Sequence, residues 1–162
     1  MAFRRITSGA DFNSIVRLGQ TSESKHLEFV NSYDWRGTHN DDPAIDLCAD
    51  VAQFANAQGG VLLIGVTQVP RTRVAGIINA IDDVDEFRNW VERAIRSHLV
   101  PSNFAHEIVV LLTGVGPILA INIDASPSLI AVWCRETGTE YPYRAERGKE
   151  WMRMFRKNLG TI

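Results

Sequence analysis

The sequence FANAQGGVLLIGV, which spans residues 54–66, decides the interpretation of the fold. It joins the end of an amphipathic helix, predicted at residues 43–57, to an apolar strand predicted at residues 61–66. Gly59 and Gly60 lie between the two elements, and glycine ends helices because it readily adopts left-handed backbone dihedrals. The strand is almost wholly apolar, which is the pattern of a central strand covered on both faces.

Outward from this unit, the sequence continues to alternate between helices and strands. Helical spacing of apolar residues predicts further helices at residues 10–18 and 84–98. Apolar runs and turn signals predict the other strands at residues 26–30, 73–77, 108–112, 118–123, 129–134, 141–145 and 151–155. No linker or repeat interrupts the series, so we expect a single domain over residues 1–162. The predicted fold class is α+β, a mixed β-sheet with packed helices.

Composition indicates a soluble globular protein. Of the 162 residues, 45% are apolar and 22% are charged. No apolar run approaches the roughly 20 residues that cross a bilayer, so no membrane association is expected. Cys48 and Cys134 are far apart, which favours buried free thiols and a cytoplasmic setting. The net charge of −2 argues against a basic field over the whole surface, so phosphate binding is expected to be local.

Two carboxylates, Glu23 and Glu28, lie five residues apart at the entry to the first strand. On one continuous strand an odd spacing places them on opposite faces, so they converge only if the chain bends between them. Residues 19–24 provide a stretch in which such a bend can form. Converging carboxylates suit Mg²⁺ or Mn²⁺, and a metal there could activate water against a phosphate. The alternative is that Glu23 is a solvated loop charge and that Glu28 pairs with a nearby arginine.

The glycine-rich turns do not have the form of a phosphate-binding loop. Gly59 and Gly60 precede a strand rather than a helix, and no Gly-Lys-Ser/Thr sequence follows them. The turn at residues 114–116 runs into proline and a strand, so it is not a dinucleotide fingerprint. These residues therefore do not support ATP binding.

The carboxy-terminal region is the best candidate for a binding surface. Arginine forks fit phosphate groups, and aromatic rings stack on unpaired bases. The candidate nucleic-acid-binding residues of this region are Arg144, Arg147, Lys149, Trp151, Arg153 and Arg156. Lys25, beside the glutamates, would add a further contact. The alternative is a solvated edge hairpin whose aromatic side chains pack inward.

The run Phe54-Ala55-Asn56 with Gly59-Gly60, joined to the upstream glutamates, resembles the Schlafen-type AlbA-like domain family. The similarity extends nearly end to end. It implies the AlbA-like fold and a function in handling nucleic acids. In nuclease members of that family, two glutamates and an aspartate form a metal-binding triad, and the glutamates correspond to Glu23 and Glu28.

The third carboxylate of that triad is absent from its usual place. The family has an acidic residue after a Gly-Val pair, whereas this chain has Thr67 and Gln68. Gln68 offers a carbonyl oxygen without the charge, which weakens the site for a hard cation. Asp46 or Asp50, on the facing helix, could compensate. The alternative for those two aspartates is an exposed helix face.

These observations lead to one first hypothesis and two alternatives. We expect a nucleic-acid-binding domain that favours RNA over DNA and forms a homodimer. The first alternative is a divergent endoribonuclease that acts on tRNA or similar RNA, with Mg²⁺ or Mn²⁺ held by Glu23 and Glu28. The sequence leaves open whether the protein is an enzyme, because the carboxylate triad is incomplete. The second alternative is a protein-interaction subunit.

Overall fold

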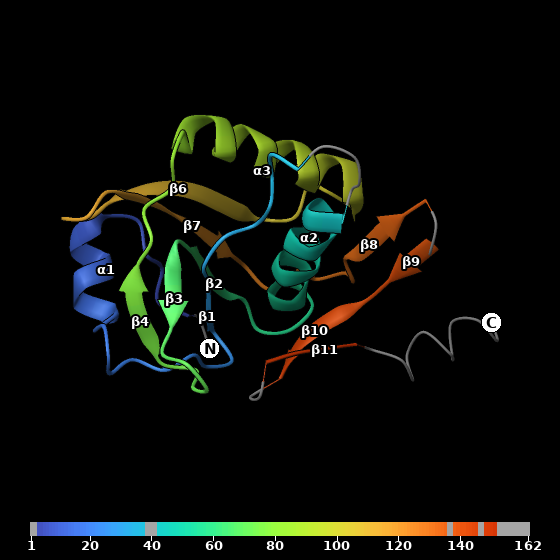
Figure 1. Ribbon diagram of the computed structural model, residues 1–162. Coiled ribbons are helices and arrows are strands. Elements are labelled where there is room, and N and C mark those ends of the chain that lie inside the picture. Colours follow the sequence, from blue (N-terminus) through green and yellow to red (C-terminus); the bar gives the residue numbers. More distant parts are fainter. Residues whose placement is uncertain (1–2, 38–41, 136–137, 146–147, 152–162) are drawn as a thin grey trace.

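A mixed four-stranded sheet forms the centre of the molecule. The computed structural model describes residues 3–37, 42–135, 138–145 and 148–151, the last range by its backbone. The strands of the sheet are β1 Leu27–Val30, β2 Gly60–Ile64, β6 His106–Leu112 and β7 Pro117–Ile123. They lie in the order β1-β2-β7-β6 (Figure 1). The β1–β2 pair is parallel and the other two pairs are antiparallel.

Strand β2 is the central strand, and all five of its residues are buried. Side chains alternate between the two faces of a strand. Leu62 and Ile64 therefore belong to one hydrophobic core, and Val61 and Leu63 belong to the other. The helices of the described residues are α1 Gly9–Ile15, α2 Asp42–Ala55 and α3 Val84–His98. The first core contains α2 and α3, and the second contains α1, so the prediction of a covered central strand is confirmed.

The glycine pair works as the sequence predicts, although α2 ends at Ala55, two residues earlier than expected. Gly59 has a left-handed φ of 77°, and its amide donates to the carbonyl oxygen of Phe54 at 2.9 Å. Gly60 allows a close approach instead. A Cβ there would lie 2.4 Å from the Phe54 ring and 2.7 Å from the carbonyl oxygen of His26. Both positions therefore require glycine.

Asn56, between α2 and the glycines, ties three segments together. Its Nδ2 donates to the carbonyl oxygens of Ile130 and Pro142, both at 2.8 Å. Its Oδ1 accepts from the amide of Ile130 at 2.7 Å. The asparagine of the helix-end sequence therefore links α2 to the carboxy-terminal strands.

Shorter strands surround the central sheet. They form the antiparallel pair β3 Val66–Gln68 with β4 Ala75–Ile78, a three-stranded sheet of β5 Leu99–Val100, β8 Ala131–Cys134 and β9 Gly138–Glu140, and a hairpin of β10 Pro142–Ala145 and β11 Gly148–Trp151.

Two expectations about these strands need correction. The strand predicted at residues 61–66 breaks at Gly65, where φ is 107°, so that Val66 begins β3. The strand predicted at residues 151–155 starts earlier, as β11, and residues 152–155 lie outside the described residues. Strands β5 and β9 are additional, since no pattern in the sequence predicts them. The α+β class itself is confirmed.

Both cysteines are buried thiols that form no disulfide, as predicted. Burial raises the pKa of the Cys48 thiol, with the Asp50 charge as a second cause. No helix within the described ranges has the length and apolar content that spanning a membrane requires.

Candidate functional site

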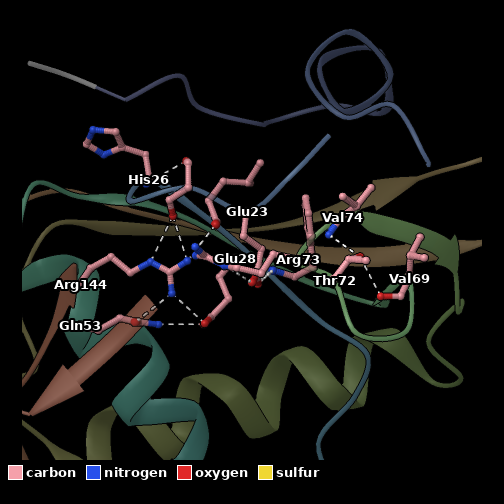
Figure 2. Close-up of polar contacts among 12 residues, drawn as sticks. Glu23, His26, Glu28, Gln53, Val69, Thr72, Arg73, Val74 and Arg144 are labelled. Carbon is pink, nitrogen blue, oxygen red and sulfur yellow. Dashed lines mark hydrogen bonds and ion pairs between the residues drawn. The ribbon is translucent and has the colours of Figure 1, made fainter. Parts of the chain in front are cut away.

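A tight turn brings the two glutamates of the sequence together. Ser24 and Leu27 exchange backbone hydrogen bonds, at 3.0 and 3.3 Å, so the chain folds back between Glu23 and Glu28. The Glu23 carboxylate then accepts from the amide of Phe29 at 2.9 Å. Figure 2 shows the two carboxyl groups in one cluster of polar side chains. The bend lies at residues 24–27, after Glu23 rather than in the expected 19–24 stretch.

Arg73 pairs with the first carboxylate. Its Nε lies 3.3 Å from Glu23 Oε1, and the side chain of Glu23 is only 7% exposed. The interpretation of Glu23 as a solvated loop charge is therefore wrong. Arg73 precedes β4, whose neighbouring residues pair with the segment that contains Glu23. This pairing of distant segments fixes the contact.

Arg144 pairs with the second carboxylate from inside the protein. Its Nη1 donates to Glu28 Oε1 at 2.8 Å and to Gln53 Oε1 at 3.1 Å. Gln53 Nε2 in turn donates to Glu28 Oε2 at 2.8 Å, and the guanidinium stacks over the Phe54 ring at 5.0 Å. The arginine alternative for Glu28 is therefore confirmed. The three polar side chains come from β10, β1 and α2 and form one network (Figure 2).

The remaining donors of Arg144 hold the turn itself. Nε and Nη2 donate to the carbonyl oxygen of Ser24 at 3.2 and 2.9 Å, and Nη2 donates to that of Leu27 at 3.0 Å. The side chain of Arg144 is 0% exposed. Its guanidinium is thus engaged within the protein rather than presented to a ligand, in contrast to the surface role that the sequence analysis assigns to it.

The other candidate contacts are placed as follows. Lys25 is exposed at the tip of the turn between the glutamates. Gln68 is exposed in β3, and Asp46 is exposed on α2. Lys149 and Trp151 lie in β11, which pairs with β10, but their side chains lie outside the described residues. Outside the described residues altogether are Arg147, Arg153 and Arg156.

Burial makes the Glu28 carboxyl group a weaker acid than usual. Its pKa is raised to about 7, first by burial and then by the charge of Asp50, while Arg144 acts in the opposite direction. Asp50 is itself engaged, because it accepts from the hydroxyl of Tyr33 at 2.5 Å. Burial, together with the Asp50 charge, raises the pKa of Tyr33. Asp50 therefore faces the site, whereas Asp46 matches the alternative of an exposed helix face.

The carboxylates do not fit a divalent cation as they are arranged. Each of the four oxygens of Glu23 and Glu28 already accepts a hydrogen bond, from Phe29, Arg73, Arg144 or Gln53. A hard cation is favoured by negatively charged oxygen ligands, and here the guanidinium groups of Arg73 and Arg144 already offset that charge. Within the described residues, no three His, Cys, Asp or Glu side chains form a group that could hold a metal ion. The two guanidinium groups supply the positive charge instead.

The raised pKa of Glu28 predicts a pH-dependent stability. Because the folded pKa lies above the usual 4.5, folded protein binds more protons than unfolded protein between pH 4.5 and about 7. The contribution of Glu28 to stability is therefore present below pH 4.5 and is lost as the pH rises through about 7. Thermal melts from pH 4 to 8 should show wild type losing stability relative to Glu28→Gln as the pH rises. Parallel curves for the two proteins would contradict the assignment.

Three residues of this site, Gln53, Arg73 and Tyr33, are not predicted from the sequence. Gln53 lies on the polar stripe of α2, and its position opposite the apolar face of that helix was the available signal. It is nevertheless fully buried. No local pattern marks Arg73 or Tyr33, since their partners lie 50 and 17 residues away.

Comparison with known protein families matches residues 23–154 to the Schlafen AlbA_2 family. The match covers most of the chain, and the chain belongs to this family. Membership indicates a function related to nucleic acids. It also confirms the resemblance that the glutamates and the glycine pair carry.

A solved structure with a similar fold is the crystal structure of the DIP2311 protein from Corynebacterium diphtheriae. The sequence identity is 19% and the TM-score is 0.58, over 88% of this chain. This chain spans 26% of the length of that protein, so the likeness concerns the fold of one part of it. No curated protein matches the chain.

Proposed function

We propose that this protein binds nucleic acid, with unpaired RNA favoured over DNA, and that it binds without cutting. Family membership supports the first part. The observation that carries the second part is the engagement of both carboxylates by arginines, with the Arg144 side chain 0% exposed. In the described residues, arginines of the same chain thus neutralise the acidic site. Such a site stabilises the fold beneath a binding surface but provides no hydrolytic chemistry.

Four basic residues beside this site form a surface that we call the basic edge. They are Arg17, Lys25, Arg71 and Arg73. They come from two segments that lie side by side. The backbone amide of Gly19 donates to the carbonyl oxygen of Ala75 at 2.6 Å, and the backbone amide of Glu23 donates to that of Arg73 at 2.8 Å.

The exposure and charge of the basic edge suit phosphate. Arg17, Lys25 and Arg71 are exposed, and within the described residues none of them forms a salt bridge. Arg71 also has a left-handed φ of 66°, which is uncommon for a residue with a side chain. A local cluster of this kind gives salt-dependent phosphate binding even when the net charge of the protein is −2.

The carboxy-terminal basic region is the second part of the proposed interface. Its hairpin is anchored beside the basic edge by the bonds from Arg144 to Ser24 and Leu27. The proposed contacts are Arg147, Lys149, Trp151, Arg153 and Arg156. We also propose that the protein forms a homodimer, which would enlarge the binding surface.

A gel shift with single-stranded RNA at low salt tests the binding. Lys25→Glu combined with Arg71→Glu should weaken retention by about tenfold or more and should lower the slope of affinity against salt by about two phosphate contacts. Both positions are exposed, so folding should be preserved. Arg144 is unsuitable for this test because its substitution disturbs the interior.

Arg93→Glu is the control for a single charge reversal. Arg93 is exposed on α3, away from the basic edge, and its substitution carries the same change of charge as Lys25→Glu or Arg71→Glu alone, which is half that of the double variant. Its effect should stay within the small, non-specific change that one surface charge produces. Equal retention by wild type and the Lys25/Arg71 double variant would reject the basic edge as the interface.

Metal-dependent RNA cleavage is the alternative function. It is favoured by the convergence of Glu23 and Glu28, with the charge of Asp50 close enough to raise the pKa of Glu28. It requires Arg73 and Arg144 to leave the carboxylates they engage. Cleavage of RNA that depends on Mn²⁺ and disappears in Glu28→Gln would establish it.

A further inference from the structure

A cavity of about 220 Å³ lies beyond the ends of the two parallel strands. Asn31 follows the last residue of β1, and Ile64 is the last residue of β2. In open sheets, ligands bind outside the carboxyl ends of parallel strands. The other principal walls are Trp35, Asn79, Asp82 and Phe87.

Three residues that line the cavity are aromatic, namely Tyr33, Trp35 and Phe87. Trp35 packs edge-on against Phe87, with ring centroids 5.7 Å apart. Phe87 is buried and stacks in turn on Trp90. These packed rings fix the position of Trp35. The loop that carries Trp35 turns tightly, because its amide donates to the carbonyl oxygen of Tyr33 at 2.8 Å. The cavity therefore has a wall of mutually packed aromatic side chains.

A pair of amides supplies the polar side. Asn79 Nδ2 donates to Asn31 Oδ1 at 2.7 Å, and both side chains are exposed. This bond leaves the Nδ2 donors of Asn31 and the Oδ1 acceptor of Asn79 without another side-chain or backbone partner among the described residues. A donor and an acceptor side by side match the edge of a nucleobase, as single amides do when they bind adenine.

The charges around the cavity and its volume limit which kind of ligand it can bind. Arg36 stands over the Trp35 ring at 4.5 Å but is paired with Asp83, and Asp82 lines the cavity as well. Acidic side chains therefore outnumber basic ones here. They would repel a phosphate group but not an uncharged ring. The volume lies below the roughly 300–1,000 Å³ of pockets for drug-sized ligands, which suits one ring system rather than a whole nucleotide.

We propose that this cavity binds a single unpaired nucleobase of the nucleic acid, between the Trp35 wall and the amides of Asn31 and Asn79. The inference rests on the proposed function and names the part of the ligand that is recognised. Strand β4 lies between the two regions. Asn79 follows Arg73, on the basic edge, by six positions, which is about 20 Å at about 3.3 Å per residue. A bound strand would thus meet phosphate contacts at one end of β4 and a base pocket at the other.

Titration with the four free ribonucleosides tests the pocket without any phosphate. In ¹⁵N-labelled protein, at least one nucleoside should shift the indole N–H signal of Trp35 and the side-chain amide signals of Asn31 and Asn79 in a saturable manner. Inorganic phosphate should leave these signals unchanged. Asn79→Leu should weaken nucleoside binding about tenfold or more, because the acceptor is lost. Asn31→Leu, at a second exposed position, should do the same.

Asn103→Leu is the control, since Asn103 is exposed beyond the opposite end of α3. It should leave nucleoside binding unchanged. No saturable shift with any nucleoside, or equal binding by wild type and Asn79→Leu, would overturn the assignment. If RNA is retained in the gel shift but no nucleoside binds, the pocket alone is rejected. If neither binds, the proposed function is rejected as well.

Discussion

Arg144→Met is expected to lower the free energy of unfolding by about 3–5 kcal/mol, as the removal of one partner from a buried ion pair does. The substitution leaves the Glu28 carboxylate buried without its cation and removes the donors to Ser24 and Leu27. For a chain of this size, the midpoint of thermal unfolding should fall by about 6–20 °C. Circular dichroism melts and urea titrations measure both quantities.

Two further variants test whether the loss of stability in Arg144→Met comes from the buried Arg144–Glu28 pair. Arg135→Met changes an exposed arginine of the same region and should shift stability by no more than about 0.5 kcal/mol. Arg144→Met combined with Glu28→Leu should recover part of the loss, because no unpaired charge then remains inside. Wild-type stability in Arg144→Met would show that the buried pair does not hold the hairpin.

Asn56→Ala should lower the free energy of unfolding by about 2–4 kcal/mol, because buried polar groups are left without partners. The substitution removes donors to Ile130 and Pro142 and the acceptor for the Ile130 amide. Both partner residues are buried, so water cannot readily replace the lost bonds. Chemical denaturation measures the loss. The unfolding free energy is fitted with the same m-value, its slope against denaturant concentration, for both proteins.

The matched controls for Asn56 separate its hydrogen bonds from its size. Asn56→Asp keeps the shape but turns the donor into an acceptor that faces two carbonyl oxygens, so it should destabilise at least as much as alanine. Gln58→Ala, two residues away and exposed, should be close to neutral. A stable Asn56→Asp variant would mean that shape alone accounts for this residue.

The sequence predicted the centre of the fold because its signals there are local. A helix, two glycines and an apolar strand follow one another within residues 43–66, and each has its own chemical reason. The short strands β5 and β9 have two and three residues, which is too few for an alternating pattern. Their pairing with β8 depends on segments distant in the sequence.

The sequence predicted the acidic half of the site but not its partners. Glu23 and Glu28 stand out because a turn can bring them together, and the turn at residues 24–27 does so. Arg144 belongs to an alternating strand, and alternation does not indicate which face of an edge hairpin meets the protein. Its contact with Glu28 joins residues 116 positions apart, which no local pattern reveals.

The measurement that tests the central claim most directly is the fate of RNA incubated with purified protein, with and without Mn²⁺. The claim is that Arg73 and Arg144 form ion pairs with the Glu23 and Glu28 carboxylates, and that the protein binds RNA without cutting it. We predict retained and intact RNA in both conditions, with retention reduced by the Lys25/Arg71 double variant. Fragments that form only with Mn²⁺, and that vanish in Glu28→Gln, would contradict it.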